Sequence, residues 1–212
     1  MALLSRKYWL IGEFCVLFLL LPLLFLAGWL PNSAMLPALW AVFLYAALVL
    51  TANGARWWRW DFPRGALSGL LQRSLWVAAL LCALALVIAQ DKFLDFVRRA
   101  PAFWLLVMLL YPLLSALPQE LVYRRFFFDR YRALFGMGDK AFLVLNAALF
   151  SYMHIVFLNP VAVACTFVGG LMFAATYRRS RSLYLTALEH GLYGNLVFTV
   201  GLGQYFYHAA VA

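Results

Sequence analysis

Long apolar runs separated by short polar segments dominate the pattern of this chain. About seven of these runs approach the ~20 residues that a helix needs to cross the hydrocarbon core of a bilayer. Pro, Gly and Asn residues punctuate the breaks between them. The pattern predicts an all-α, polytopic transmembrane helical bundle of about seven spans, with a long fourth one. The predicted spans are residues 8–30, 34–52, 74–90, 101–128, 141–158, 161–177 and 183–201.

Composition supports this interpretation. Of the 212 residues, 67% are apolar and 12% are charged, and the mean hydropathy is +0.87. A water-soluble domain is closer to half apolar, so the excess must face lipid. The length suits one bundle, and we predict a single integral membrane domain over residues 1–212, with the candidate chemistry in residues 101–201.

The positive charge predicts an orientation. The net charge is +9, and we attribute it to basic residues that collect in the cytoplasmic loops of a membrane protein, not to a nucleic-acid groove. With the N-terminus inside, most of the 17 Lys and Arg residues fall in cytoplasmic segments, and only Lys92, Arg98 and Arg99 fall outside. This bias predicts an N-in, C-out topology. It fits a plasma or an endoplasmic-reticulum membrane; we expect the plasma (inner) membrane and no nucleic-acid partner.

Ionisable residues inside the hydrocarbon are costly and mark paired or functional groups. Among the acidic residues, only Glu13, Glu120 and Glu189 fall within predicted spans, and His154 and His190 join them. The sequence leaves the role of Glu13 open.

Three short segments carry most of the candidate chemistry. In the first, Glu120 and Arg124 are four residues apart and share a helix face, where they can pair. In the second, Phe150 and His154 share a face that Asn146 extends by one turn. The alternatives are a structural ion pair in the first segment and a packed aromatic beside a hydrogen-bonded histidine in the second.

The third segment begins at Glu189 and places a carboxylate, an imidazole and an amide in one apolar span. Interhelical hydrogen bonding is the alternative to a functional role here. Gly191 and Gly194 permit a close backbone approach, or serve helix packing alone. With a rise of about 1.5 Å per residue, Glu120, His154 and His190 reach similar depths from the cytoplasmic side. We expect them to converge in a cavity open to the cytoplasm.

At these residues the chain resembles the CAAX-protease and bacteriocin-processing (CPBP, or Abi) family of intramembrane endopeptidases. The family patterns are EExxxR, FxxxH and a late His with a nearby Asn, often HxxxN. This chain has Gln119-Glu120 with Arg124, then Phe150 with His154, then His190 with Asn195. The resemblance implies a hydrolase that cleaves a membrane-associated protein or peptide, which in eukaryotic relatives is prenylated. It implies that Glu120, Arg124, His154, His190 and Asn195 are catalytic, and we add Gln119, Tyr123, Asn146, Phe150, Glu189 and Tyr193 as candidates for the substrate cleft.

The chain departs from the family at two positions. Gln119 stands where the family has its first Glu, and a neutral amide cannot act as a general base. Asn195 follows His190 by five residues, about 140° around an ideal helix, and the usual position is Gly194. A helical bulge would bring Asn195 back; otherwise Tyr193 or Glu189 supplies the polar contact.

The resemblance leads to a specific hypothesis about mechanism. Glu120, with His154 nearby, activates a water molecule, and Arg124 orients the carboxylate. His190 and Asn195 donate hydrogen bonds to the oxyanion. Glu120, His154 and His190 are the alternative, a three-ligand zinc site. No HExxH pattern and no Cys/His zinc spacing occurs in the sequence, so we favour the metal-free mechanism and predict no firm cofactor.

Two other functions stay open. The first is a non-catalytic immunity or scaffold membrane protein of the same fold, which Gln119 supports. The second is a transporter or proton relay that uses Glu13, Glu120 and Glu189.

Overall fold

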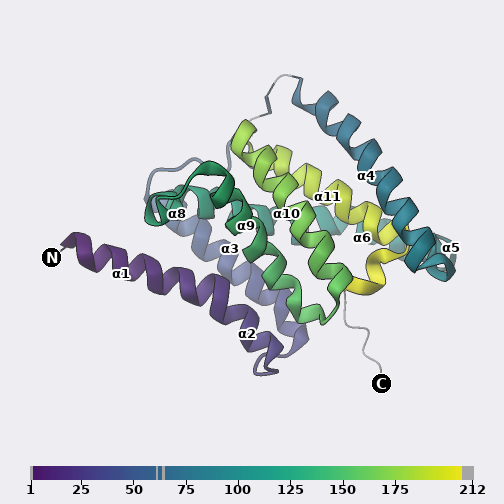
Figure 1. Cartoon of the computed structure of the whole chain (residues 1–212), viewed down its shortest axis with the longest axis horizontal. Helices are drawn as coiled ribbons and strands as arrows, with labels where there is room; N and C mark the ends of the chain where they lie inside the picture. Colours follow the sequence, from purple (N-terminus) through teal and green to yellow (C-terminus); the bar gives the residue numbers. More distant parts are fainter. Residues whose placement is uncertain (1, 61, 64, 207–212) are drawn as a thin grey trace.

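The fold is all-α over residues 2–60, 62–63 and 65–206, which the computed structural model describes, with side chains from residue 6 onward (Figure 1). Its α-helices are α1 (Ala2–Phe14), α2 (Leu21–Leu26), α3 (Met35–Ala52), α4 (Ala66–Ile88), α5 (Asp95–Arg99), α6 (Pro101–Tyr111), α7 (Leu117–Glu120), α8 (Phe127–Phe135), α9 (Asp139–Met153), α10 (Pro160–Ser180) and α11 (Leu183–Thr199). Three π-helical segments join neighbouring helices: η1 (Cys15–Leu20), η4 (Pro112–Ala116) and η5 (Leu121–Phe126). Short 3₁₀ turns are η2 (Asn32–Ala34), η3 (Gln90–Lys92), η6 (His154–Phe157) and η7 (Leu202–Phe206).

Six helical stretches in the described part of the chain are long and apolar enough to cross a membrane, where the sequence predicts about seven. They are Arg6–Leu26, Asn32–Ala52, Ala66–Ile88, Pro101–Phe135, Asp139–Phe157 and Pro160–Ser180. The predicted seventh span forms α11, which has 17 residues and is shorter than these six. Large apolar side chains such as Leu75, Trp76 and Val87 are more than 70% exposed, as lipid-facing residues are.

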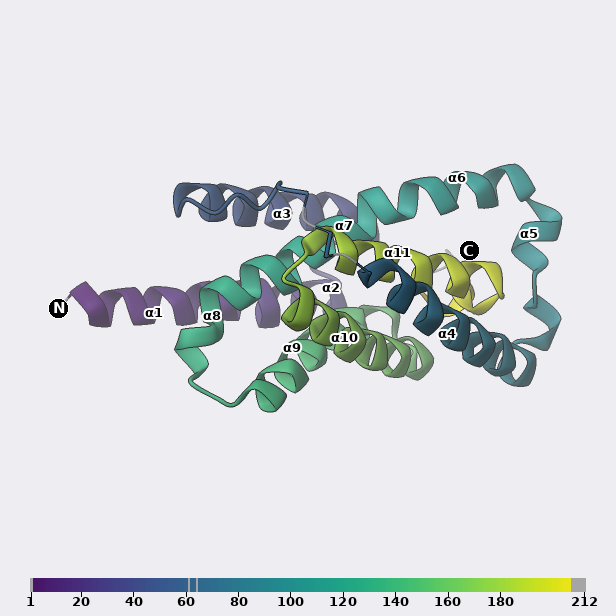
Figure 2. The same ribbon diagram turned by 90° about the horizontal axis from the view of Figure 1, so that it is seen from above.

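The fourth span is longer than predicted. It runs without interruption through α6, η4, α7, η5 and α8, from Pro101 to Phe135, and Figure 2 shows it as one bent helix that crosses the whole molecule. The last turns stay helical because Phe127, Phe128 and Tyr131 bury their rings in the core. The helix ends at Gly136, whose φ of +58° favours glycine.

Two prolines lie inside this long helix, and each leaves one backbone carbonyl without its usual donor. Proline has no N–H, so Pro112 and Pro118 cannot donate to the residues four positions earlier. Hydrocarbon offers no water in compensation, so another protein group must donate. The indole of Trp40 donates to the carbonyl of Leu114 over 3.0 Å. The side-chain amide of Asn195 donates to the carbonyl of Met108, also over 3.0 Å.

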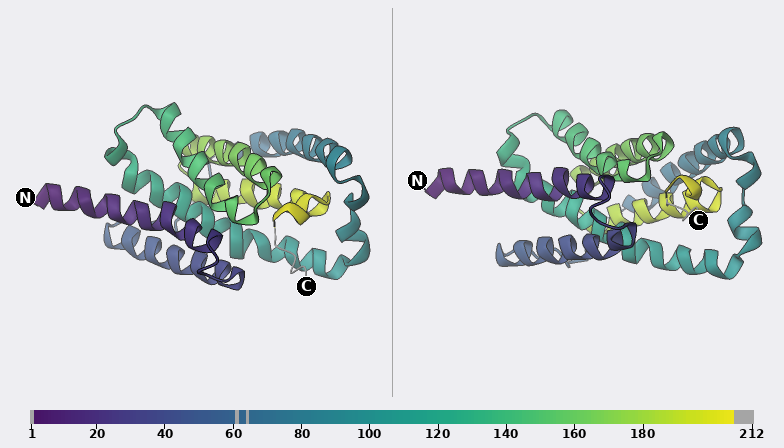
Figure 3. Two further views of the ribbon diagram at one scale, coloured as in Figure 1. Left: turned by 60° about the horizontal axis from the view of Figure 1, so that its bottom comes forward. Right: turned by 90° about the horizontal axis from the view of Figure 1, so that it is seen from below.

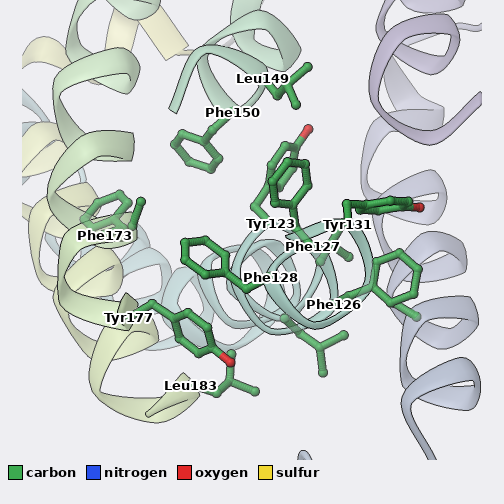
Figure 4. Close-up of a cluster of buried hydrophobic side chains, with 14 of the residues drawn as sticks. Tyr123, Phe126, Phe127, Phe128, Tyr131, Leu149, Phe150, Phe173, Tyr177 and Leu183 are labelled. Atoms are coloured by element: carbon green, nitrogen blue, oxygen red, sulfur yellow. The ribbon is translucent and has the colours of Figure 1, made fainter. Parts of the chain in front are cut away.

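Aromatic side chains fill the core between the long helix and its neighbours. Figure 4 shows Phe127, Phe128 and Tyr131 in a cluster that also receives rings from α9 and α10. Most of the ring pairs meet edge to face, such as Phe128 and Tyr177 at 5.2 Å between centroids. This packing fixes the rotation of the long helix, and therefore the direction of the side chains on α7.

Glu13 attaches the first helix to this core. Its carboxylate accepts hydrogen bonds from Arg130 at 2.5 and 2.6 Å, from Tyr45 at 2.7 Å and from the hydroxyl of Tyr131. Glu13 is only 8% exposed, and the contacts come from α3 and α8. Figure 3 shows α1 lying along the long helix at this end of the molecule. Glu13, whose role the sequence leaves open, is thus a buried carboxylate that joins α1 to α3 and α8.

Candidate active site

The centre of the candidate site is a buried chain of three charged or polar side chains. Glu120, at the end of α7, is fully buried and lies between Arg124 and His190. One carboxylate oxygen is 3.1 Å from Nε of Arg124, and the other is 2.9 Å from Nδ1 of His190. The i, i+4 spacing on the long helix produces the first contact. The second contact joins α7 to α11 across 70 residues.

Arg124 is held from several sides. Its Nη1 donates to Oδ1 of Asn146 over 2.6 Å, and the amide of Asn146 donates to the backbone carbonyl of Tyr123 over 2.6 Å. The guanidinium also lies 4.9 Å from the ring centroid of Phe150, within the range of a cation–π contact. All of these groups are buried, so the ion pair with Glu120 is shielded from solvent. Asn146 and the backbone of Tyr123 therefore hold the guanidinium of Arg124 in its orientation toward Glu120.

The imidazole of His190 is fixed on three sides. Its ring stacks on Phe173 with centroids 4.6 Å apart and an interplanar angle of 18°. Its Nδ1 faces Glu120, and its Nε2 is 3.0 Å from the hydroxyl of Tyr111. A carboxylate only accepts hydrogen bonds, so Nδ1 carries the hydrogen that is donated to Glu120. Tyr111 is the last residue of α6 and directly precedes Pro112, the first of the two prolines.

The two glycines of α11 allow the long helix to come this close. A Cβ on Gly191 would lie 2.9 Å from Cβ of Pro112. A Cβ on Gly194 would lie 2.1 Å from Cε1 and 2.6 Å from the hydroxyl oxygen of Tyr111. Neither space is available to a larger residue without displacement of the ring. Gly194 therefore provides the space in which Tyr111 reaches His190.

His154 begins the turn η6 at the end of α9, four residues after Phe150. Its Nδ1 is 2.8 Å from the carbonyl oxygen of Phe150. A carbonyl only accepts, so Nδ1 is the donor and Nε2 carries the lone pair of the neutral ring. The ring of Phe150 contacts His154 at 4.9 Å and His190 at 5.5 Å between centroids. The two histidines thus both contact one aromatic ring.

Two cavities meet at His154. The larger has a volume of about 490 Å³ and lies between α4, α10, α11 and the η4 turn. The smaller, of about 210 Å³, lies against η1, α2 and α3. Tyr111, His190 and Tyr193 line the larger cavity. Four residues line both: Ser115, Gln119, His154 and Phe157. Most of the remaining lining is apolar, while Glu120 and Arg124 are among the lining residues of neither cavity.

Gln119, which stands where the family motif has its first Glu, therefore lies where the two cavities meet. Its side-chain nitrogen donates to the hydroxyl of Ser115 over 2.8 Å. This bond leaves the amide oxygen of Gln119 as an acceptor for other groups. Gln119 and His154 share both cavities, whereas the neighbouring Glu120 points into the protein interior toward Arg124 and His190.

Glu189 forms a separate pair on another face of α11. Its carboxylate accepts from Arg73 of α4 at 3.3 Å and from the hydroxyl of Tyr193 at 3.0 Å. Glu189 is fully buried, and the side chain of Arg73 is 38% exposed. The sequence offers Glu189 or Tyr193 as the polar partner of His190 in place of Asn195. In the structure these two side chains bond to each other, and Tyr111 is the partner of His190.

Asn195 lies away from His190. The helix α11 runs from Leu183 to Thr199 as an α-helix, without the bulge that would bring the side chain back. The amide of Asn195 instead donates to the carbonyl of Met108, which Pro112 cannot serve. The i+5 spacing therefore places Asn195 on the face of α11 that supports the long helix.

The three candidate zinc ligands do not form a three-ligand set. Both ring nitrogens of His190 already face protein groups, and Nδ1 of His154 faces a carbonyl. Across the described ranges, no group of three His, Cys, Asp or Glu side chains is arranged to hold a metal ion. The residues of this site thus do not fit the zinc alternative.

Three residues of the site are not among those predicted from the sequence: Tyr111, Ser115 and Phe173. Tyr111 and Ser115 precede the first motif in a long apolar run, where an isolated Tyr or Ser is unremarkable. Phe173 lies in an apolar helix among many aromatics. The one available signal is the pair of glycines in α11, whose missing side chains require a large residue from another helix to fill the space.

Comparison with known families covers this part of the chain. Residues 101–196 match the family model described as Rce1-like, type II CAAX prenyl endopeptidase Rce1-like. No curated protein and no solved structure gives a significant match. The matched segment begins with α6 and ends in α11, so it contains Glu120, His154 and His190. Over residues 101–196, the chain is therefore similar to the Rce1-like family of type II CAAX prenyl endopeptidases.

Proposed function

We propose that the chain is an intramembrane endopeptidase that hydrolyses a peptide bond near the C-terminus of a prenylated, membrane-associated protein. The observation that carries this proposal is the position of His154 and Gln119, which line two mostly apolar cavities at the same place. A substrate with its scissile bond at this point extends into a cavity on each side. Apolar walls suit a lipid-modified segment better than a charged solute.

His154 is the best candidate for the general base. Its Nδ1–H is donated to the carbonyl of Phe150, which leaves Nε2 as the atom that accepts a proton. In the proposed reaction, a water oxygen attacks the scissile carbonyl carbon and its proton passes to Nε2 of His154. The same proton then passes to the leaving nitrogen as the C–N bond breaks. The amide oxygen of Gln119 accepts the second hydrogen of the water and orients it.

Glu120 has a different role in this proposal from the one that the sequence indicates. Its carboxylate is fully buried, with one oxygen 3.1 Å from Nε of Arg124 and the other 2.9 Å from Nδ1 of His190. It is therefore a positioning residue, which fixes the orientation of His190. The lining of the cavities by His154, and not by Glu120, favours this division of labour.

We further propose the orientation that the basic residues predict, with the N-terminus and the site facing the cytoplasm of the inner membrane. Arg125, Arg178 and Arg181 lie at the same end of the bundle and pair with Asp129 or Asp139. A positively charged end of this kind favours the cytoplasmic side.

The decisive experiment uses the full chain in proteoliposomes with a synthetic farnesylated peptide that ends in Cys-aliphatic-aliphatic-X. Mass spectrometry identifies the products of the wild type, the His154→Ala variant and a Tyr152→Phe control. Tyr152 lies next to the site in sequence but lines neither cavity. We expect release of the last three residues by the wild type and the control, and a loss of about 10²–10⁴ in rate for His154→Ala. An intact peptide that binds to the wild type without being cut favours the non-catalytic alternative.

A further inference from the structure

We infer that Tyr111 is a catalytic residue, whose phenol hydrogen is donated to the oxyanion of the tetrahedral intermediate. The inference rests on the proposed peptidase function. It begins from the 3.0 Å contact between the hydroxyl of Tyr111 and Nε2 of His190, and from the position of both side chains in the wall of the larger cavity. Gln119 and His154 line the same cavity, so the hydroxyl shares a space with the groups that hold the water.

The hydroxyl of Tyr111 is suited to this role because it can donate and accept at the same time. In the imidazolium form of His190, Nδ1–H is donated to Glu120 and Nε2–H to the phenol oxygen, and the phenol hydrogen is left for an acceptor in the cavity. Glu120 and the ring of Phe173 hold His190 in place, so the phenol oxygen has a fixed partner. A donor fixed before the reaction stabilises a developing oxyanion more than one that must reorganise.

The absence of a side chain at Gly194 leaves the space that the ring of Tyr111 occupies. A Cβ on Gly194 would lie 2.6 Å from the phenol oxygen and 2.1 Å from Cε1 of the ring. Gly194 is four residues after His190, so a side chain at position 194 would share the face of α11 that carries the imidazole. The ring of Tyr111 therefore fills the space of the missing side chain at position 194. Asn195 does not serve instead, because its side chain lies away from His190 and reaches the carbonyl of Met108.

An edge-to-face contact with Phe198, at 5.2 Å between centroids, further limits the rotation of the Tyr111 ring. The hydroxyl is thus held by His190 at its tip, while Gly194 and Phe198 confine the ring. A purely structural tyrosine would need only the ring. The hydroxyl is the part that the inference concerns, and Tyr111→Phe removes it alone.

The test measures kcat and KM for the farnesylated peptide with the wild type, Tyr111→Phe and the control Tyr152→Phe. Tyr152 also donates its hydroxyl to a backbone carbonyl, that of Leu19, at 3.4 Å and away from both cavities. We expect Tyr111→Phe to lower kcat by roughly 10²–10³, with KM changed less than about twofold. The control should retain both constants.

A second comparison asks whether another donor can replace the phenol. Tyr111→Ala removes the ring, and Tyr111→Ala with Gly194→Asn places an amide in the vacated space on the same helix face. We expect the double variant to exceed Tyr111→Ala in kcat by about tenfold or more, since an amide N–H also donates to an oxyanion. The single variant Gly194→Asn should be less active than the double variant, because the ring of Tyr111 occupies its space.

The outcomes separate this inference from the function on which it rests. If the wild type does not cut the peptide, the proposed peptidase function fails and the role of Tyr111 fails with it. If the wild type cuts and Tyr111→Phe has the same kcat, only the role of Tyr111 is overturned. A loss in Tyr111→Phe that falls on KM alone also overturns it, because an oxyanion donor acts on the transition state.

Discussion

The side-chain amide of Asn195 donates to the backbone carbonyl of Met108 at 3.0 Å, and Met108 is the residue whose usual partner would be the missing N–H of Pro112. This relationship connects α11 to the long helix next to the candidate site. It also explains why Asn195 stands five residues, and not four, after His190. The residue supports the backbone that carries Tyr111.

The relationship predicts that Asn195→Ala lowers the free energy of unfolding by about 1–2 kcal/mol, because a carbonyl in hydrocarbon loses its donor. Pro112→Ala restores an N–H that can serve Met108. We therefore expect Asn195→Ala to cost less in the Pro112→Ala background, which a double-mutant cycle from thermal unfolding in detergent measures. Equal costs in the two backgrounds would show that the amide does not substitute for the missing N–H.

Glu13 gives a second prediction. We expect Glu13→Gln to lower the free energy of unfolding by about 3–5 kcal/mol, because it leaves Arg130 partly buried without its counter-ion. Asp95→Asn is the matched control, since it removes an ion pair with Arg99, whose side chain is 77% exposed. An exposed pair contributes at most about 1 kcal/mol. Chemical denaturation in the same detergent gives the free energy of unfolding of both variants. Equal losses would contradict the role of Glu13 in holding α1 to α3 and α8.

Glu120 and Arg124 give a third prediction, which separates stability from activity. Glu120→Gln leaves Arg124 charged and buried, with an expected cost of about 3–5 kcal/mol. The double variant Glu120→Gln/Arg124→Leu removes that charge, and we expect it to regain most of the stability. It should stay inactive, because His190 has lost the carboxylate that orients it. Unfolding scans and peptide turnover on the same samples make the comparison, and recovery of both properties together would disprove the positioning role.

Gln119 gives a fourth prediction. Gln119→Glu places a proton acceptor between the two cavities, and Ser115 can turn its hydroxyl to donate to it. We expect kcat to rise, by up to about 10²-fold, because a carboxylate beside His154 assists in taking the proton of water. Gln119→Leu, similar in size and without polar atoms, should lower kcat. A Gln119→Glu variant with reduced kcat and unchanged KM would indicate that the amide itself is needed to orient the water.

The helical pattern and the membrane class could be predicted from the sequence, because apolar runs of spanning length are a direct consequence of the bilayer. The number of spans does not follow from the apolar runs alone, since α11 is short and buries Glu189 and His190. The predicted end of the long helix at residue 128 is too early. The charges after that residue suggest a loop, but the buried rings of Phe127 and Tyr131 keep the chain helical as far as Phe135.

The approach of Glu120 to Arg124 could be predicted from their spacing, and the family was confirmed over residues 101–196. The contact of Tyr111 with His190 could not be predicted from the sequence, because it depends on the distance between α6 and α11. That separation is set by Gly191 and Gly194, and a glycine in a sequence does not say which residue will use its space. The division of roles between Glu120 and His154 depends on which side chain lines a cavity, which spacing alone cannot give.

The bond between Trp40 and Leu114 limits how the matched segment can be used. Residues 101–196 contain every motif, but they lack the indole that serves the carbonyl freed by Pro118. They also lack Leu39 and Val42, which close one side of the smaller cavity. A fragment or chimera that transplants this segment alone would carry an open carbonyl in lipid and half of a binding site. The segment that defines the family is thus not a portable module, and the N-terminal helices are part of its working unit.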